Sequence, residues 1–141
     1  MNAHRLSRRS GGFTLVEVTI ATAVAAVLAS IALPSYRGQQ MRAGRVDAVA
    51  ALTRLQAAQE QYRGLHGLYA GQLGPLRGVG PTSPQGRYGV ALARVGAEGY
   101  RATATALAGG PQAADSECAE LTLEVVRGFA RTGPSARCWQ R

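Results

Sequence analysis

Chemistry in this sequence could come from a small set of cysteine, histidine and acidic residues. They are Cys118, Cys138, His4, His66, Asp115, Glu117 and Glu120. Two cysteines with no histidine nearby argue against zinc, because tetrahedral zinc generally takes three or four protein ligands. The three interrupted acidic residues are too few for calcium, which takes about 6–8 oxygen ligands. Neither histidine has an evident nucleophile beside it, and the glycines lack the Lys-Ser/Thr of a phosphate loop. The sequence therefore predicts no enzyme, no metal and no cofactor.

Glu17 is the most unusual charged residue, because it lies inside an apolar stretch. The stretch from Phe13 to Leu33 can cross a membrane as a helix, since residues rise ~1.5 Å each and the hydrocarbon core is ~30 Å thick. A carboxylate at such a depth costs roughly 2.5–3.5 kcal/mol, so we expect Glu17 to have a partner. The preceding segment, residues 1–12, carries Arg5, Arg8 and Arg9. These charges favour a cytoplasmic leader with the rest of the chain outside.

Two simpler interpretations of the apolar stretch are weaker. A secretory signal peptide has an apolar core of ~7–15 residues followed by a small-residue cleavage site, for which Ser30-Ile31-Ala32 could serve. The length of the stretch, the internal Glu17 and the position of Gly12 before the stretch argue against it. A plain membrane anchor would explain the length but not the carboxylate.

The charge of the chain is strongly positive. Its formal net charge is +8, and all of its basic side chains are arginine, because it has no lysine. Without residues 1–12, 13 arginines stand against 8 acidic residues, a net of +5. Such a balance favours nucleic acid or anionic surfaces. A GC-rich coding bias would explain the absence of lysine equally well, so composition leaves both open.

The two cysteines lie in the part of the chain predicted to face an oxidising compartment. A Cys118–Cys138 disulfide is the economical interpretation, with two free thiols as the alternative. Closing a loop of about 20 residues would stabilise the fold by about 3 kcal/mol. We expect it to pin the last strand against the sheet, with Trp139 packed over it.

Beyond the apolar stretch, the sequence predicts a head over residues 35–141. Pro34 should kink the helix, because it removes a hydrogen bond to Ser30. Apolar positions at three- or four-residue spacing predict an amphipathic helix over 35–63, with Gly38 and Gly44 weakening it by about 1 kcal/mol each. Gly64 is the predicted stop, and a Gly- and Pro-rich loop over 64–86 should follow, with Tyr69 and Leu73 tucked inward.

The rest of the head, residues 87–141, predicts an antiparallel meander. RYGVALAR and YRATATAL read as a hairpin, followed by the strands AELTLEVV and FARTG. Apolar and polar residues alternate along them, so one face of the sheet is free to cover the amphipathic helix. The fold class is therefore α+β, a long helix packed by its second half on a four-stranded antiparallel sheet.

Gly12, Phe13 and Glu17, set between a basic leader and an apolar run, resemble the class III signal of type IV prepilins and pseudopilins. The resemblance implies that prepilin peptidase cleaves after Gly12 and methylates the amine of Phe13. Glu17 would then pair with the terminal amine of a neighbouring subunit in the filament. Implied partners are other pilins, the peptidase, the pilus assembly platform and the inner membrane. The head would be periplasmic before assembly into a cell-surface pilus.

The second half of the chain is similar to PilE-like type IV pilins, through Cys118, Leu121-Thr122-Leu123, Gly128 and Cys138-Trp139. We therefore expect a structural subunit of a type IV pilus, a minor pilin. The alternatives are a DNA-binding competence pilin and, further off, a pseudopilin of type II secretion. A DNA receptor would gather its arginines into one patch. Candidates are Arg77, Arg87, Arg94, Arg101, Arg127, Arg131, Arg137 and Arg141. We expect scattered charges and hence weak, nonspecific binding.

Overall fold

The computed structural model describes residues 12–140 of the chain. The leader arginines Arg5, Arg8 and Arg9, and Arg141 at the other end, lie outside the described residues. The chain divides into two compact units at Arg37 and Gly38, and each unit is described by itself. A single helix, α1 (Leu15–His66), contributes to both.

In the first unit α1 exposes its apolar side chains on all sides, as the values for Leu15 (80%), Ile20 (60%) and Ile31 (70%) show. Its most apolar window has a mean hydropathy of 2.1, and within the described residues α1 alone is long and apolar enough to cross a membrane. The helix continues through Pro34 without interruption. The kink expected there stays a prediction.

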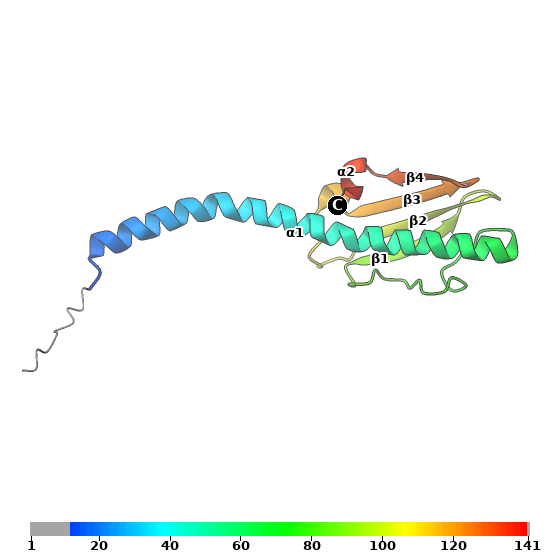
Figure 1. The fold of residues 1–141 in the computed structure, drawn as a ribbon, viewed down its shortest axis with the longest axis horizontal. Coiled ribbons are helices and arrows are strands. Elements are labelled where there is room, and N and C mark those ends of the chain that lie inside the picture. The colour runs from blue at the N-terminus through cyan, green and yellow to red at the C-terminus, as the bar shows by residue number, and fades with distance from the viewer. Residues whose placement is uncertain (1–11, 141) are drawn as a thin grey trace, which may run out of the picture. The chain divides into compact units, whose positions relative to one another are not determined.

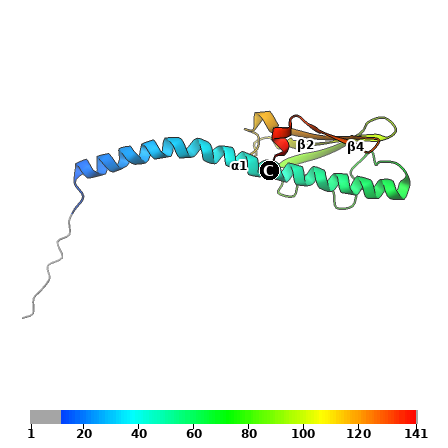
Figure 2. The same ribbon diagram turned by 45° about the horizontal axis from the view of Figure 1, so that its top comes forward.

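The second unit is a four-stranded antiparallel sheet with the later turns of α1 along one face (Figures 1 and 2). The strands are β1 (Tyr88–Arg94), β2 (Gly99–Ala106), β3 (Glu120–Val126) and β4 (Phe129–Gly133), in the order β1-β2-β3-β4. Two short helices follow β2 and β4, namely η1 (Ser116–Cys118) and α2 (Ala136–Trp139). The predicted α+β fold is confirmed.

The core lies between α1 and the inner face of the sheet. Leu52 and Leu55 on α1 are completely buried, and so are Tyr100, Ala104 and Leu121 on the sheet. Alternate residues of each strand supply this face, because successive side chains of a strand point to opposite sides. The loop adds buried Tyr69 and partly buried Leu73, as the sequence indicated.

Two expected boundaries are wrong. The amphipathic helix was expected over 35–63, with Gly64 as its stop, but it ends at His66. Gly67 supplies the left-handed residue (φ 75°) that closes it. The Gly67 amide donates to the Arg63 carbonyl at 2.8 Å. The sheet expected over 87–141 also ends earlier, because Cys138 lies in helix α2, although the predicted strand FARTG coincides with β4. The strand ends at Gly133, before cis-Pro134.

Candidate functional site

The start of α1 carries the residues of the predicted processing signal. Gly12 and Phe13 precede the helix, and Phe13 is 81% exposed. Thr14 caps the helix, since its Oγ1 accepts a hydrogen bond from the Glu17 amide at 3.2 Å. Thr14 and Glu17 have the spacing of a capping box, a local signal that the sequence analysis missed.

This position gives Glu17 a stabilising factor within its own helix, apart from the neighbouring subunit that the family resemblance implies. It lies in the first turn of α1, where the unpaired amides of a helix carry partial positive charge. A carboxylate there is favoured by about 0.3–1 kcal/mol when exposed. This is smaller than the cost of burying the charge in a membrane, so the need for a partner in the bilayer remains.

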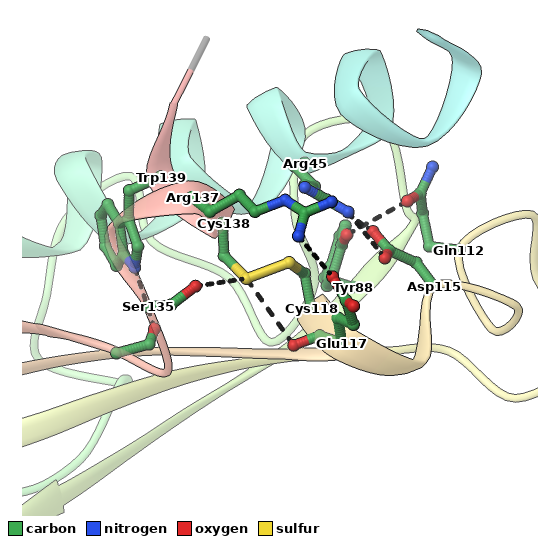
Figure 3. Close-up of a disulfide and its surroundings, with 11 residues drawn as sticks. Arg45, Tyr88, Gln112, Asp115, Glu117, Cys118, Ser135, Arg137, Cys138 and Trp139 are labelled. Atoms are coloured by element: carbon green, nitrogen blue, oxygen red, sulfur yellow. Dashed lines mark hydrogen bonds and ion pairs between the residues drawn. A yellow bond between two sulfur atoms is a disulfide. The ribbon is translucent and has the colours of Figure 1, made fainter. Parts of the chain in front are cut away.

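A buried polar cluster joins α1 to the segment before η1 (Figure 3). Arg45 donates two hydrogen bonds to Asp115, from Nε at 2.6 Å and from Nη2 at 2.8 Å. The hydrogen bond to this carboxylate raises the pKa of Arg45. Asp115, one of the three acidic residues judged too few for a calcium site, is thus occupied by an arginine. Within the part of the chain that the structure describes, no cluster of His, Cys, Asp or Glu could hold a metal ion.

Gly44 is the close-packing point of this cluster. The buried side chain of Gln112 lies directly against it, and a Cβ placed at Gly44 would be 1.6 Å from the Gln112 Nε2. Gln112 Oε1 also accepts a hydrogen bond from the Tyr88 hydroxyl at 3.3 Å. Helix propensity alone makes Gly44 a weak point of the helix, whereas in the structure Gly44 makes room for the Gln112 side chain.

The predicted disulfide is present between Cys118 and Cys138, with a Cα–Cα distance of 5.6 Å. It joins η1 to α2, beside the Arg45–Asp115 pair (Figure 3). Trp139 packs next to it and donates from Nε1 to the Gly133 carbonyl at 2.9 Å. The bond therefore fastens the end of the chain to the segment that Arg45 holds.

The arginines of the head divide into paired and unpaired groups. Five form ion pairs: Arg45 with Asp115, Arg63 with Glu60, Arg101 with Glu124, Arg127 with Glu98 and Arg137 with Glu117. Arg94 donates instead to the Tyr69 carbonyl at 3.2 Å. Among the described residues, Arg37, Arg42, Arg54, Arg77, Arg87 and Arg131 form no ion pair. Three of them, Arg54, Arg77 and Arg87, lie on the head part of α1 or on the segment between α1 and β1, and we call these three the α1–loop surface.

The α1–loop surface exists because α1 holds the long loop in place. Asp47 accepts hydrogen bonds from the Ser83 hydroxyl (2.5 Å) and the Gln85 amide (2.9 Å). At the other end, Gln59 exchanges two hydrogen bonds with Ala70, each of 2.9 Å. The loop from Gly78 to Pro84 lines a small hollow together with Arg54. Arg54, Arg77 and Arg87 therefore stand on a framework fixed by buried side chains.

Arg77 and Arg87 are among the arginines that the sequence offers as DNA contacts, and Arg54 is not among them. The signal that could have found the surface is Asp47, an acidic residue beside the apolar stripe of the predicted helix. It is only 2% exposed, and a buried carboxylate needs several donors. The neighbouring loop, with its serine and free amides, is the nearest source of them.

Two protein-family models match the chain. The model described as "Type IV minor pilin ComP, DNA uptake sequence receptor" matches residues 34–122, which is more than half of the chain. The model described as "Prokaryotic N-terminal methylation motif" matches residues 7–33. No curated protein matches the chain. The first match covers the α1–loop surface and ends before β4 and Cys138.

Proposed function

Because the chain belongs to the ComP family of type IV minor pilins, we propose that it is a minor pilus subunit whose head binds double-stranded DNA for uptake. The observation that carries the proposal is the match to a family described as a DNA uptake sequence receptor over residues 34–122. It favours the interpretation that the sequence analysis ranked second. The simpler alternative is a pilus subunit with only structural partners.

The DNA contact is assigned to the α1–loop surface. Arg54, Arg77 and Arg87 lie within the matched residues, and among the described residues they form no ion pair. Their guanidinium groups are therefore available to phosphates without first breaking an ion pair. Phosphate contacts position a protein on DNA, and contacts to base edges select the sequence. The glycine-rich loop carrying Arg77 supplies backbone that can approach a groove closely, since Gly74 and Gly78 have open space around them.

The N-terminal segment serves assembly in this proposal. Prepilin peptidase cleaves after Gly12, and the amine of Phe13 is methylated. The match to the methylation motif over residues 7–33 supports both steps. The chain resides in the inner membrane with its head in the periplasm, and other pilins and the assembly platform incorporate it into a surface filament. Glu17 then meets the amine of a neighbouring subunit.

The DNA part of the proposal is tested with the full-length chain in detergent micelles. Labelled duplexes selected from a random library should share a short motif and bind at least ~10³-fold more tightly than unselected duplex. Replacing Arg54, Arg77 and Arg87 together by alanine should reduce the salt dependence of log K by about 2.7, since each phosphate contact contributes ~0.9.

Arg137→Ala is the matched control, because Arg137 is paired with Glu117 and lies beyond the residues matched by the family model. It should leave the selected duplex bound. Selection that enriches no motif, together with equal effects of all four arginines, would refute a receptor. The chain would then be a pilus subunit with the weak electrostatic affinity expected from its charge.

A further inference from the structure

The face of the sheet turned away from α1 carries an unusual set of side chains. We call it the outer sheet face and define it by Arg101, Thr103, Thr122, Glu124, Phe129 and Arg131. The strand registers arrange these residues in rows: Thr103, Thr122 and Gly133 form one row, and Arg101, Glu124 and Arg131 the next. Val126 and Phe129 lie opposite each other beyond them.

Phe129 is the most exposed aromatic residue of the head. It is 80% exposed, although a phenylalanine ring on a strand normally gains its stability from burial. It lines a hollow of about 380 Å³ with Glu124, Val126, Arg127 and Arg131. A second hollow of about 550 Å³ adjoins it across Glu124 and Arg131. The rest of its lining is Ala91, Arg101, Thr103, Glu120, Thr122, Thr132 and Gly133. The two hollows share Glu124 and Arg131, and Phe129 is the one aromatic ring among their lining residues.

The charges around this ring favour an anionic ligand. Glu124 is already bound by Arg101, and Arg131 forms no ion pair among the described residues. Arg127 pairs with Glu98 at 3.3 Å, with both side chains more than two-thirds exposed, and such a pair contributes little and exchanges easily. Glu120, also on this face, lies toward the opposite end of β3 from Phe129. Phe129 thus stands between two arginines that can reach phosphates.

We propose that the outer sheet face binds unpaired DNA, with one base stacked on Phe129 and the flanking phosphates on Arg127 and Arg131. An aromatic ring beside basic side chains on an open sheet is the arrangement that binds single strands. Phe129 and Arg131 are two residues apart on one strand, about 7 Å, so one nucleotide and its neighbour can reach both. Paired bases present no free face, so the ring selects single strands over duplex.

This inference goes beyond the proposed function, which concerns duplex DNA on the α1–loop surface. The residues assigned to the base and its phosphates, Arg127, Phe129 and Arg131, also lie beyond the end of the family match at residue 122. A nucleic-acid ligand accounts for the threonine hydroxyls and arginines around the ring. A protein partner buried against this face would have to supply a hydrogen-bond partner for each of those polar groups.

The test measures binding of labelled oligothymidylate, about 12 nucleotides long, to the full-length chain in detergent micelles. Phe129→Ala should weaken binding about tenfold, and Phe129→Tyr should retain it because the ring is kept. Arg131→Ala should reduce the salt dependence of log K by about 0.7, the value of one phosphate contact to a single strand. Leu65→Ala is the matched control, since Leu65 is an equally exposed apolar residue (83%) on α1.

The outcomes separate this inference from the proposed function. Phe129→Ala binding oligothymidylate within about twofold of the parent chain would overturn the inference. A loss of pilin contacts in that variant with unchanged oligothymidylate binding would also overturn it, and would assign the face to a neighbouring subunit. Blunt duplex binding should depend on Arg77 and not on Phe129. Blunt duplex binding that does not depend on Arg77 would refute the proposed function and leave the inference about Phe129 standing.

Discussion

Gly44→Ala tests whether this glycine is a weak point of α1 or a packing requirement. If only helix propensity mattered, the substitution would stabilise the head by up to about 1 kcal/mol. The structure predicts the opposite sign. A Cβ at this position would be 1.6 Å from Nε2, 2.2 Å from Cδ and 2.8 Å from Oε1 of Gln112. The whole amide group of Gln112 would have to move, and it has little room to do so because Gln112 is only 2% exposed.

The magnitude follows from what Gln112 would lose. Forcing an extra carbon into a packed site costs about 1–3 kcal/mol. Moving the amide also removes the acceptor of the Tyr88 hydroxyl, and a buried hydroxyl without a partner costs about 1–3 kcal/mol. After subtracting the gain in propensity, Gly44→Ala should lower the free energy of unfolding by about 1–5 kcal/mol.

Urea unfolding of the full-length chain in detergent micelles, followed by Trp139 fluorescence, measures this change. Gly64→Ala is the control, since Gly64 belongs to the same helix, and a Cβ there has no neighbour within 4 Å. It should stabilise by about 0.5–1 kcal/mol. In the double variant Gly44→Ala/Gln112→Ala the clash is absent. Its loss in free energy of unfolding should therefore be smaller than the sum of the losses in the two single variants. A Gly44→Ala head as stable as the parent would refute the packing argument.

Three further predictions concern the core, the disulfide and the membrane segment. The Tyr100 hydroxyl is buried and has no hydrogen-bond partner among the described residues, so Tyr100→Phe should stabilise by about 1 kcal/mol in urea titration, whereas Tyr88→Phe should not. Burial raises the pKa of Tyr100 above its ordinary 10.0, so the contribution of Tyr100 to stability should be constant well below pH 10 and should be lost above pH 10 as the unfolded state ionises. The fall in stability above pH 10 should therefore be less steep in Tyr100→Phe. Cys138→Ser should cost about 3 kcal/mol, and a reducing agent should lower parental stability by the same amount; two alkylatable thiols in the native protein would contradict this. Glu17→Val should insert into the membrane normally and enter filaments poorly, and normal incorporation would count against Glu17 as an assembly contact.

The fold was predictable from local patterns because the spacing of apolar residues differs between the helix and the strands. Alternation in β2 and β3, with alanines and leucines on one side, fixed the inner face of the sheet. The apolar stripe of α1 fixed the surface that meets it. The helix end was misplaced by a few residues because Gly64 and Gly67 are both candidates from sequence. Only the left-handed conformation of Gly67 separates them.

The sites were harder to predict because they depend on contacts between distant segments. Arg45 and Asp115 are separated by 70 positions, and no periodicity links them. Gly44 appears weak until Gln112 is placed against it. The arginines could be counted, but their pairing with acidic residues depends on strand register, as the Arg101–Glu124 pair shows. What remains unpaired is therefore a property of the fold and not of composition.

The two DNA surfaces proposed for this head lie at opposite edges of the sheet. The loop of the α1–loop surface joins the β1 edge, where Thr82 pairs with Gly89, while Phe129 is on β4, the other edge. Four strands spaced ~4.8 Å apart separate these edges by about 14 Å. At this distance substitutions on the two surfaces should act independently on binding. Changes in β4 can therefore alter contact with unpaired DNA while duplex recognition within the family-matched part of the chain is retained.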